Sequence, residues 1–360
     1  MLGYPKEMDG YLKMIDKPMT PILAALDNLS VAEVQGSDPY EVASAAALMK
    51  FYDELYENDK ADVVSVEQTF TANIPDTRFQ ITGRFDTMLR NERGELVNLE
   101  HKTTSRNLDD RFHPQLTKTS FDRQISLYHL LGYLNGQYIA ETQLDVIRKV
   151  ALKPKAPMLG NKNKIFGTRR EIEERSSYYG VKLGQETLTK FRNGDLKRET
   201  PEMYGARVTD VVSRTPEKYY RRKRNITRSN DELKFALHQL IVMAKEIERT
   251  EDEKLYYQNT GACHSYGSVC PYFQLCSGTD SMESNSWQPR RGAASSGRFN
   301  LSHSRIGVFN SCRAKYFYMY VKGIEKKTRE DSDALRYGSL VHDALEQYWL
   351  THKEINDVDA

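Results

Sequence analysis

The chain contains 360 residues, of which 39% are hydrophobic and 28% are charged, a balance typical of a globular protein. Its 52 basic and 50 acidic residues leave a net charge of +2, which excludes a uniformly basic surface for nucleic acid. Four cysteines are too few for a disulfide-built fold, the first residues lack a secretory signal pattern, and no apolar run reaches the roughly 20 residues that cross a bilayer. We therefore expect a soluble, cytoplasmic protein whose thiols are ligands or core residues.

Helical and extended patterns alternate along the first half of the chain. A weak helical signal covers Pro21–Leu29, and a stronger one runs from a cap at Ser37 to about Asn58. β-Branched and aromatic residues then predict three strands, at Val63–Ile74, Phe79–Leu89 and Glu95–Thr103. A helix over Phe121–Leu134 and a strand over Gln143–Val150 follow. This order predicts an α/β fold in which helices flank a central mixed sheet.

Two basic stretches and one helix follow. Arg148–Arg170 has eight basic residues and no acid, so a solvated loop and a phosphate-binding loop are both open interpretations. Tyr219–Arg224 interleaves aromatic and basic residues, a mixture that suits single-stranded nucleic acid but also occurs on solvated surfaces. Asp231–Ile247 predicts a helix that leads towards a group of cysteines.

A predicted hairpin carries the strongest chemical signal. Alternation along a strand places Glu100 and Lys102 on one face. If Gly94 is left-handed in a three-residue loop, facing positions sum to 186, so Asp86 lies across from Glu100. Two opposed carboxylates suit Mg²⁺ or Mn²⁺, and Lys102 adds a cation that can stabilise the attacking hydroxide and the transition state. A surface ion pair between Glu100 and Lys102 is the alternative, and spacing alone favours it.

These residues resemble the core of the PD-(D/E)XK nucleases. The motif consists of Gly83-x-x-Asp86 and an apolar run ending in Glu100-x-Lys102, without the Pro-Asp dipeptide, as is usual in the RecB-like branch. Two further elements of that branch have counterparts here, Gln124-x-x-x-Tyr128 and Gly338-x-x-x-His342. Gln124 and Tyr128 lie four residues apart and share a helical face, and Gly338 would let its helix approach the sheet closely.

The resemblance assigns a role to each of these side chains. It implies that Asp86, Glu100 and His342 hold Mg²⁺ or Mn²⁺. It implies that Lys102 positions and activates water. It also implies that Gln124 and Tyr128 orient the DNA or the site.

The cysteines extend the resemblance. Cys263, Cys270 and Cys276 lie in one short stretch, and Cys312 follows beyond a segment rich in Ser and Gly. Four thiolates are the number that an iron–sulfur cluster or a structural zinc ion requires. The stretch resembles the carboxyl-terminal cysteines of AddB-type helicase–nucleases and of CRISPR-associated and phage exonucleases. This resemblance implies a structural 4Fe-4S cluster.

The elements occur in a different order from the family's, which would place the histidine and one cysteine first. A circular permutation explains this order, with residues 1–276 as the nuclease core, 277–300 as a flexible linker, and 301–360 as the opening helices of the same domain. A 24-residue linker reaches roughly 25 to 30 Å, enough to join the original ends. The alternative is that residues 301–360 begin a truncated second copy, in which case His342 and Cys312 act in trans.

The leading interpretation is therefore a Mg²⁺- or Mn²⁺-dependent deoxyribonuclease, an exonuclease acting on DNA ends or single strands in recombination, repair or CRISPR-type processing. The chain has no Gly-x-x-x-x-Gly-Lys-Ser/Thr phosphate loop, so a helicase or recombination partner would supply unwinding. The alternative is a non-catalytic nucleic-acid-binding module with zinc on the four cysteines. That alternative leaves Asp86, Gln124 and His342 unexplained.

Overall fold

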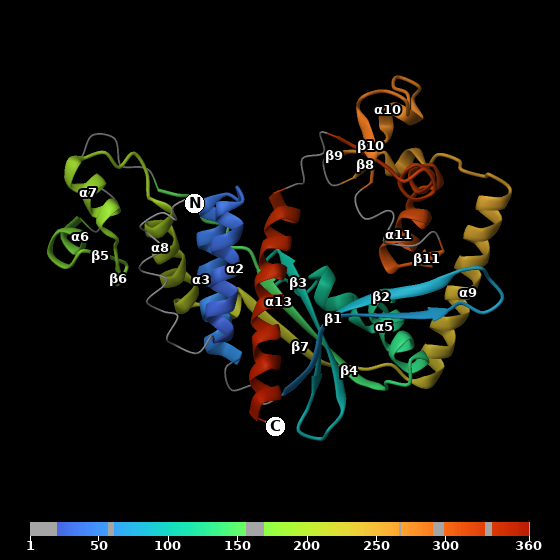
Figure 1. Cartoon of the computed structure of the whole chain (residues 1–360), viewed down its shortest axis with the longest axis horizontal. Helices are drawn as coiled ribbons and strands as arrows, with labels where there is room; N and C mark the ends of the chain where they lie inside the picture. The colour runs from blue at the N-terminus through green and yellow to red at the C-terminus, as the bar shows by residue number, and fades with distance from the viewer. Residues whose placement is uncertain are drawn as a thin grey trace, which may run out of the picture.

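The computed structural model describes residues 20–56, 61–155, 169–265, 268–290, 299–327 and 333–359. The fold is α/β, with a mixed central sheet flanked by helices (Figure 1), as the sequence predicts. The sheet has the order β1-β2-β3-β4-β7, and β11 pairs with β2. Its strands are β1 (Asp62–Asn73), β2 (Gln80–Arg90), β3 (Leu96–Thr104), β4 (Ile139–Arg148), β7 (Tyr220–Ile226) and β11 (Asn300–Leu301). No helix among the described residues combines the length and the apolar character needed to cross a membrane.

The hairpin of β2 and β3 has the predicted register. Thr87 pairs with Leu99 and Arg90 with Leu96, so facing positions sum to 186. Gly94 is left-handed, with φ of 75°, and its N–H donates to the Asn91 carbonyl at 2.8 Å. A glycine satisfies this backbone conformation without a steric penalty, which fixes the turn and hence the register.

The edge of β2 that faces β3 contains a gap. This edge pairs with β3 from Thr87 onward and with β11 at the start of β2. Residues 82–86 pair with no strand on this edge in the described part of the chain. The Arg84 carbonyl instead accepts a hydrogen bond from the Tyr128 hydroxyl, and Asp86 Oδ2 accepts one from a backbone N–H of β3, both at 2.8 Å. The sheet therefore opens where the predicted site residues lie.

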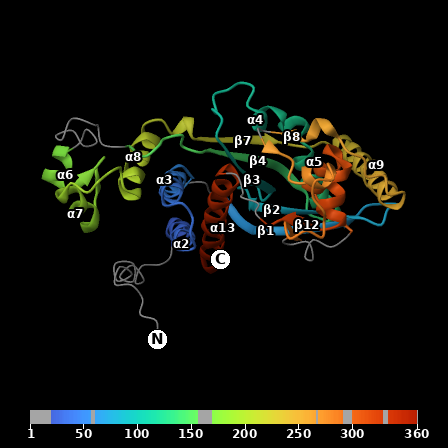
Figure 2. The same ribbon diagram turned by 90° about the horizontal axis from the view of Figure 1, so that it is seen from above.

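Helices cover both faces of the sheet (Figures 1 and 2). One face packs against α2 (Pro21–Val34), α3 (Pro39–Tyr56), α8 (Pro201–Arg214) and α13 (Asp333–Asp359). The other packs against α5 (Arg123–Leu134), α9 (Asn230–Asp252), α11 (His303–Ser311) and α12 (Arg313–Tyr316). Buried residues of α13 recur every three or four positions, from Tyr337 through Val341 to Tyr348, so one apolar stripe faces the core.

A small unit lies at the end of the molecule away from α9 (Figures 1 and 2). It contains α6 (Arg169–Arg175), α7 (Gln185–Asn193) and a hairpin of β5 (Ser177–Tyr178) and β6 (Val181–Lys182), with its own apolar cluster. Glu199 and Arg207 form a buried ion pair at 2.6 Å where this unit meets α8. Of the basic stretch Arg148–Arg170, residues 156–168 lie outside the described part of the chain.

The remaining short elements follow the chain. They are α4 (Pro114–Thr117), η2 (Lys118–Phe121), η3 (Pro216–Lys218), η4 (Thr260–Ala262), β8 (His264–Ser265), β9 (Ser268–Val269), α10 (Phe273–Cys276), β10 (Trp287–Pro289), the π-helical turn η5 (Phe317–Val321) and β12 (Ile324–Lys326).

Two stretches have more regular structure than their composition suggests. The basic stretch Tyr219–Arg224 largely forms strand β7, and alternation turns Arg222 inward, where its side chain is only 4% exposed against Asp145. The burial of Arg222 therefore removes one cation from this basic stretch, whereas Arg221 and Arg224 stay exposed. Within the predicted flexible linker, residues 287–289 form β10, which pairs with β12. Trp287 is buried and stacks on Tyr272 with ring centroids 5.6 Å apart, which gives this part of the linker a packed structure.

Candidate active site

Four of the predicted residues form one hydrogen-bonded group at the gap in β2. Lys102 and Glu100 project from β3 on the same face, and Lys102 Nζ donates to Glu100 Oε1. Gln124 Nε2 donates to the same oxygen at 2.7 Å and to the Tyr128 hydroxyl at 3.0 Å. The N–H of Gln124 is capped by the side chain of Asp122 at 2.8 Å, which starts α5 at this point. The spacing on strand and helix thus brings these side chains together as predicted.

Glu100 is buried with one oxygen unused. The residue is 2% exposed, and its Oε2 has no hydrogen-bond partner. Burial raises the pKa of Glu100 to about 7, against the opposing effect of Lys102. Burial acts against the charge of Lys102, but the carboxylates of Glu100, Asp86 and Asp122 together raise the Lys102 pKa. A buried carboxylate oxygen without a partner is costly, so a cation bound there would be stabilising.

Asp86 lies where β2 and β3 separate. The ladder between them ends at Thr87, the next residue, and Asp86 Oδ2 accepts the backbone N–H of His101 at 2.8 Å. Its negative charge contributes to the raised pKa values of both Glu100 and Lys102, which places Asp86 within their electrostatic reach. The register predicted from the sequence therefore holds up to the residue beside Asp86.

Helix α13 brings His342 to the same place from the end of the chain. Its ring centroid lies 6.4 Å from that of His101. Burial lowers the pKa of His342 to about 4, while Asp86 opposes the shift, so the imidazole is neutral at physiological pH. A Cβ on Gly338 would lie 3.0 Å from Thr103 Oγ1. The glycine thus permits the close approach of helix to sheet that the sequence predicts.

A buried charge network supports the site from beneath β3. Asp145 on β4 accepts hydrogen bonds from Arg222 and from the Tyr52 hydroxyl, each at 2.8 Å. Its carboxylate also lies 3.6 Å from His101 Nδ1. The backbone N–H of His101 donates to Asp86 Oδ2. The network therefore fixes the part of β3 that orients the Asp86 carboxylate. Sequence reasoning missed this network, because the partners of Asp145 come from β3, β7 and α3, which only the fold brings together.

Two charged residues beside Asp86 were not anticipated. Arg84 Nε lies 2.6 Å from Glu67 Oε2, and Glu67 belongs to β1. Glu67 has a left-handed backbone, with φ of 52°. Burial raises its pKa, and Asp86 and Glu346 are among the charges that act on it. To predict which residue of β2 lies opposite Glu67, one must know the register that the β1–β2 turn sets. The sequence contains no tight-turn motif that defines this register.

Comparison with known proteins identifies the family of the chain. The family model of the PD-(D/E)XK nuclease superfamily matches residues 15–277 and 300–360. The chain belongs to this superfamily. No curated protein matches the chain. A solved structure titled "Crystal structure of SSO0001" matches at 16% identity, covering 40% of this chain and 68% of its own, with a TM-score of 0.20.

PD-(D/E)XK nucleases generally use a divalent metal ion. In this chain, the unpartnered Oε2 of Glu100 is a suitable ligand for such an ion. The nearby Asp86 carboxylate and the neutral imidazole of His342 are donors of the expected kinds. Among the described residues, however, no three His, Cys, Asp or Glu side chains are close enough to hold one ion as they stand. Binding in this superfamily member would therefore draw these side chains together.

The four cysteines lie around one cavity of about 200 Å³, in which Cys263, Cys270, Cys276 and Cys312 are all lining residues. Asn259 connects the two chain segments, because its N–H lies 3.4 Å from Cys312 Sγ and its carbonyl 3.9 Å from Cys263 Sγ. Burial raises the pKa of Cys276 to about 11, and the other three sulfurs add to the shift. The sulfurs surround a cavity without converging on one point.

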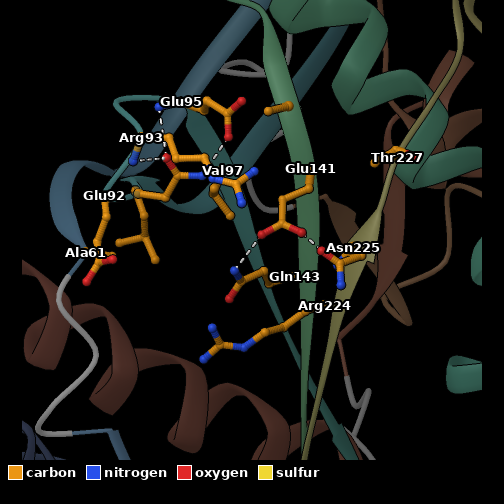
Figure 3. Close-up of a pocket in the computed structure, with 13 residues that line it drawn as sticks. Ala61, Glu92, Arg93, Glu95, Val97, Glu141, Gln143, Arg224, Asn225 and Thr227 are labelled. Carbon is orange, nitrogen blue, oxygen red and sulfur yellow. Dashed lines mark hydrogen bonds between the residues drawn. The ribbon is translucent and has the colours of Figure 1, made fainter.

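A larger open pocket lies elsewhere, at the turn between β2 and β3 (Figure 3), with a volume of about 670 Å³. Glu141 lies inside it and accepts hydrogen bonds from Gln143 Nε2 at 2.7 Å and from the Asn225 N–H at 2.6 Å. Its charges are mixed, with Arg93 and Arg224 beside several glutamates. None of the predicted site residues lines it, so we place the candidate active site at the gap in β2 instead.

Proposed function

We propose that the chain is a Mg²⁺- or Mn²⁺-dependent deoxyribonuclease, similar to RecB-like exonucleases, that hydrolyses phosphodiester bonds at DNA ends or in single strands. One observation carries the proposal: Glu100 keeps a buried, unpartnered oxygen beside Asp86, while Lys102 and Gln124 occupy its other oxygen. An inert surface ion pair would bury no such oxygen. A helicase or recombination partner would supply any unwinding.

In this proposal each side chain has a separate task. Asp86, Glu100 through Oε2, and His342 would hold the metal ion, which supplies a Lewis acid for the phosphate and for water. Lys102 keeps a positive charge, which its raised pKa favours, next to the position where negative charge develops. Gln124 orients Glu100 and is itself oriented by Tyr128.

The proposal includes completion of the site within one chain. Helix α13 packs against β1, β2 and β3, and β11 pairs with β2, so residues 300–359 contribute to the same sheet and core. This packing supports a circular permutation over a truncated second copy. Residues 1–276 would then form the nuclease core and residues 301–360 its opening helices.

A 4Fe-4S cluster on the four cysteines is the second part of the proposal. A single zinc ion requires all four sulfurs at about 2.3 Å, which places them around one point. The sulfurs here surround a cavity of about 200 Å³, a better fit for a larger group. We expect the purified protein to absorb light near 400 nm and to contain iron. Stoichiometric zinc in a colourless, active protein would exclude the cluster.

Cleavage tests the enzyme itself. Labelled single- and double-stranded DNA is incubated with Mn²⁺ and either the wild type or Lys102→Ala, and we expect the substitution to lower the rate by about 100-fold or more. Lys190→Ala is the control, because Lys190 pairs with Glu186 on the remote helix α7. A zinc-binding module without catalysis would instead bind DNA equally in all three proteins and cleave none.

A further inference from the structure

Arg84 lies beside the site on β2 and exposes most of its side chain to solvent. It precedes Asp86 by two positions on β2, and its side chain is 69% exposed. Its charge favours a lower pKa for both His342 and Asp343 of α13, so the guanidinium lies within electrostatic reach of that helix. Although Nε lies 2.6 Å from Glu67, Glu67 Oε2 accepts no hydrogen bond. Apart from this ion pair, the guanidinium of Arg84 makes no hydrogen bond to the described residues.

Glu67 has a left-handed backbone conformation whose cost exceeds the stabilisation from its ion pair with Arg84. The pairs Val66–Thr87 and Gln68–Phe85 flank it, so Glu67 lies across β1 and β2 from Asp86. Its φ of 52° is unusual for a non-glycine residue within a strand, and such strain clusters at functional sites. Because the Arg84 side chain is largely exposed, this ion pair stabilises the fold by less than the left-handed conformation of Glu67 costs. The strained backbone of Glu67 is explained if Glu67 holds the Arg84 guanidinium in a position that the protein's function requires.

The charges around the gap explain what a guanidinium would do there. Asp86 lies close enough to Glu67 and to Glu100 to raise the pKa of both, so the gap holds several carboxyl groups whose negative charge would repel the DNA backbone. A cation at the rim offsets that repulsion for one phosphate, and a guanidinium can also bind it through two parallel hydrogen bonds. Lys102 is less suited to this purpose, because its ammonium already donates to Glu100 and Gln124 inside the site.

We propose that Arg84 binds a backbone phosphate of the DNA strand beside the bond to be cleaved, and that Glu67 orients its guanidinium. This inference rests on the proposed nuclease function and adds a substrate-positioning residue to it. Arg84 acts on the phosphate directly, whereas Glu67 acts through Arg84.

The salt dependence of binding provides the test. Fluorescence anisotropy with a labelled 20-nucleotide single strand, in EDTA so that no cleavage occurs, measures affinity from 50 to 200 mM salt. Arg84→Ala should weaken binding by about tenfold at low salt and lower the salt slope by about 0.7, the value for one single-strand phosphate contact. Arg84→Lys should keep the slope while losing part of the affinity, because it retains the charge but not the planar pair of donors.

Arg214 provides a closely matched control. Its side chain is 71% exposed and pairs with Asp210, which is 22% exposed, whereas Glu67 is 21% exposed. It ends α8, on the far side of α3 from the strands of the site (Figure 1). Arg214→Ala should leave both affinity and slope unchanged. Equal affinity and slope for Arg84→Ala and Arg214→Ala would overturn the inference.

Cleavage by the wild type separates this inference from the proposed function. If the wild type cleaves DNA with Mn²⁺ and Arg84→Ala binds normally, the inference fails and the nuclease stands. If the wild type neither binds nor cleaves any DNA, both fail together. In steady-state cleavage, Arg84→Ala should raise KM by about tenfold, and the retained slope of Arg84→Lys separates a phosphate contact from a folding defect.

Discussion

Glu100 combines two properties that rarely coexist in a surface ion pair, since it is buried beside a lysine and still keeps one free oxygen. Burial raises its pKa to about 7, so near neutral pH the proton and a cation compete for the same carboxylate. His342 does not compete in this range, because burial lowers its pKa to about 4 and it is neutral above pH 5. The pH dependence of cation binding should therefore come from Glu100.

We expect the affinity for Mn²⁺ to rise as pH increases from 6 to 8. Below pH 7 the raised pKa keeps Glu100 protonated, and binding must release that proton, whereas above pH 7 the carboxylate is already free. Calorimetry in two buffers with different ionisation enthalpies measures the proton released. Glu100→Gln should abolish both the proton release and the pH dependence. Equal affinity at pH 6 and pH 8 in the wild type would contradict the assignment.

At the level of single residues, the sequence predicts those parts of the site that local geometry determines. Gly94 fixes a turn whose register identifies Asp86 and Glu100, and helical spacing pairs Gln124 with Tyr128. Glu67 depends on a longer connection between β1 and β2, whose register no turn motif defines. Arg84 and Glu67 therefore emerge only from the structure.

Among the elements, α13 has the most demanding position, because it must lie close to β3 to carry His342. Tertiary contact decides that distance, and Gly338 is the point of closest approach, with Thr103 Oγ1 only 3.0 Å from a would-be Cβ. The oxygen belongs to a β-branched side chain whose χ1 rotation is restricted, so either Thr103 or the helix must shift by a few tenths of an ångström. The identity of this one residue thus couples helix packing to the site.

We expect Gly338→Ala to lower the free energy of unfolding by about 1 to 2 kcal/mol, the usual cost of overpacking less a small gain in helix propensity. Thr103→Ala removes the obstructing oxygen and should restore much of the loss in the double variant. Gly307→Ala is the control, because nothing lies within 4 Å of its would-be Cβ. It should be neutral or stabilising by up to about 1 kcal/mol. Urea unfolding of the four variants measures these differences, and additive effects of Gly338→Ala and Thr103→Ala would show that the two residues do not clash.

The sequence also predicts most elements, with differences that reflect packing. Strand β4 begins at Ile139, four residues before the prediction, because its parallel pairing with β3 extends back to Leu96. Stretch Tyr219–Arg224 reads as basic surface, yet sheet pairing turns Arg222 into the core beside Asp145. Composition describes which side chains a segment carries, whereas the neighbouring strand decides which of them are buried.

Over the whole molecule, the chain returns to its own sheet after residues 291–298. β11 pairs with β2, α11 and α12 pack with α5 and α9, and α13 covers the opposite face. Cys312 belongs to this returning part, and the other three cysteines follow α9. A shared cluster would therefore add a further connection between two segments that packing and hydrogen bonds, such as that from Asn259 to the Ser311 carbonyl, already join.

If one cluster binds all four sulfurs, removing any one of them should disrupt the cluster and with it the same link between the two segments. We expect Cys312→Ser and Cys263→Ser each to remove the absorbance near 400 nm and to lower the melting temperature by a similar amount. The double variant should be no less stable than either single variant, because residues that act on one group are not additive. Thermal unfolding with iron and zinc analysis of each protein measures both effects.

Additive losses in the double variant, with metal content unchanged, would instead identify the thiols as independent core residues. The single variants separate these cases because Cys263 and Cys312 lie on different segments but both contact Asn259. Asn259→Ala tests whether that polar bridge alone joins the segments, since it removes the side-chain hydrogen bond to the Ser311 carbonyl at 2.8 Å. We expect it to cost about 1 kcal/mol and to leave the absorbance intact, because the sulfurs and not the asparagine would hold the cluster.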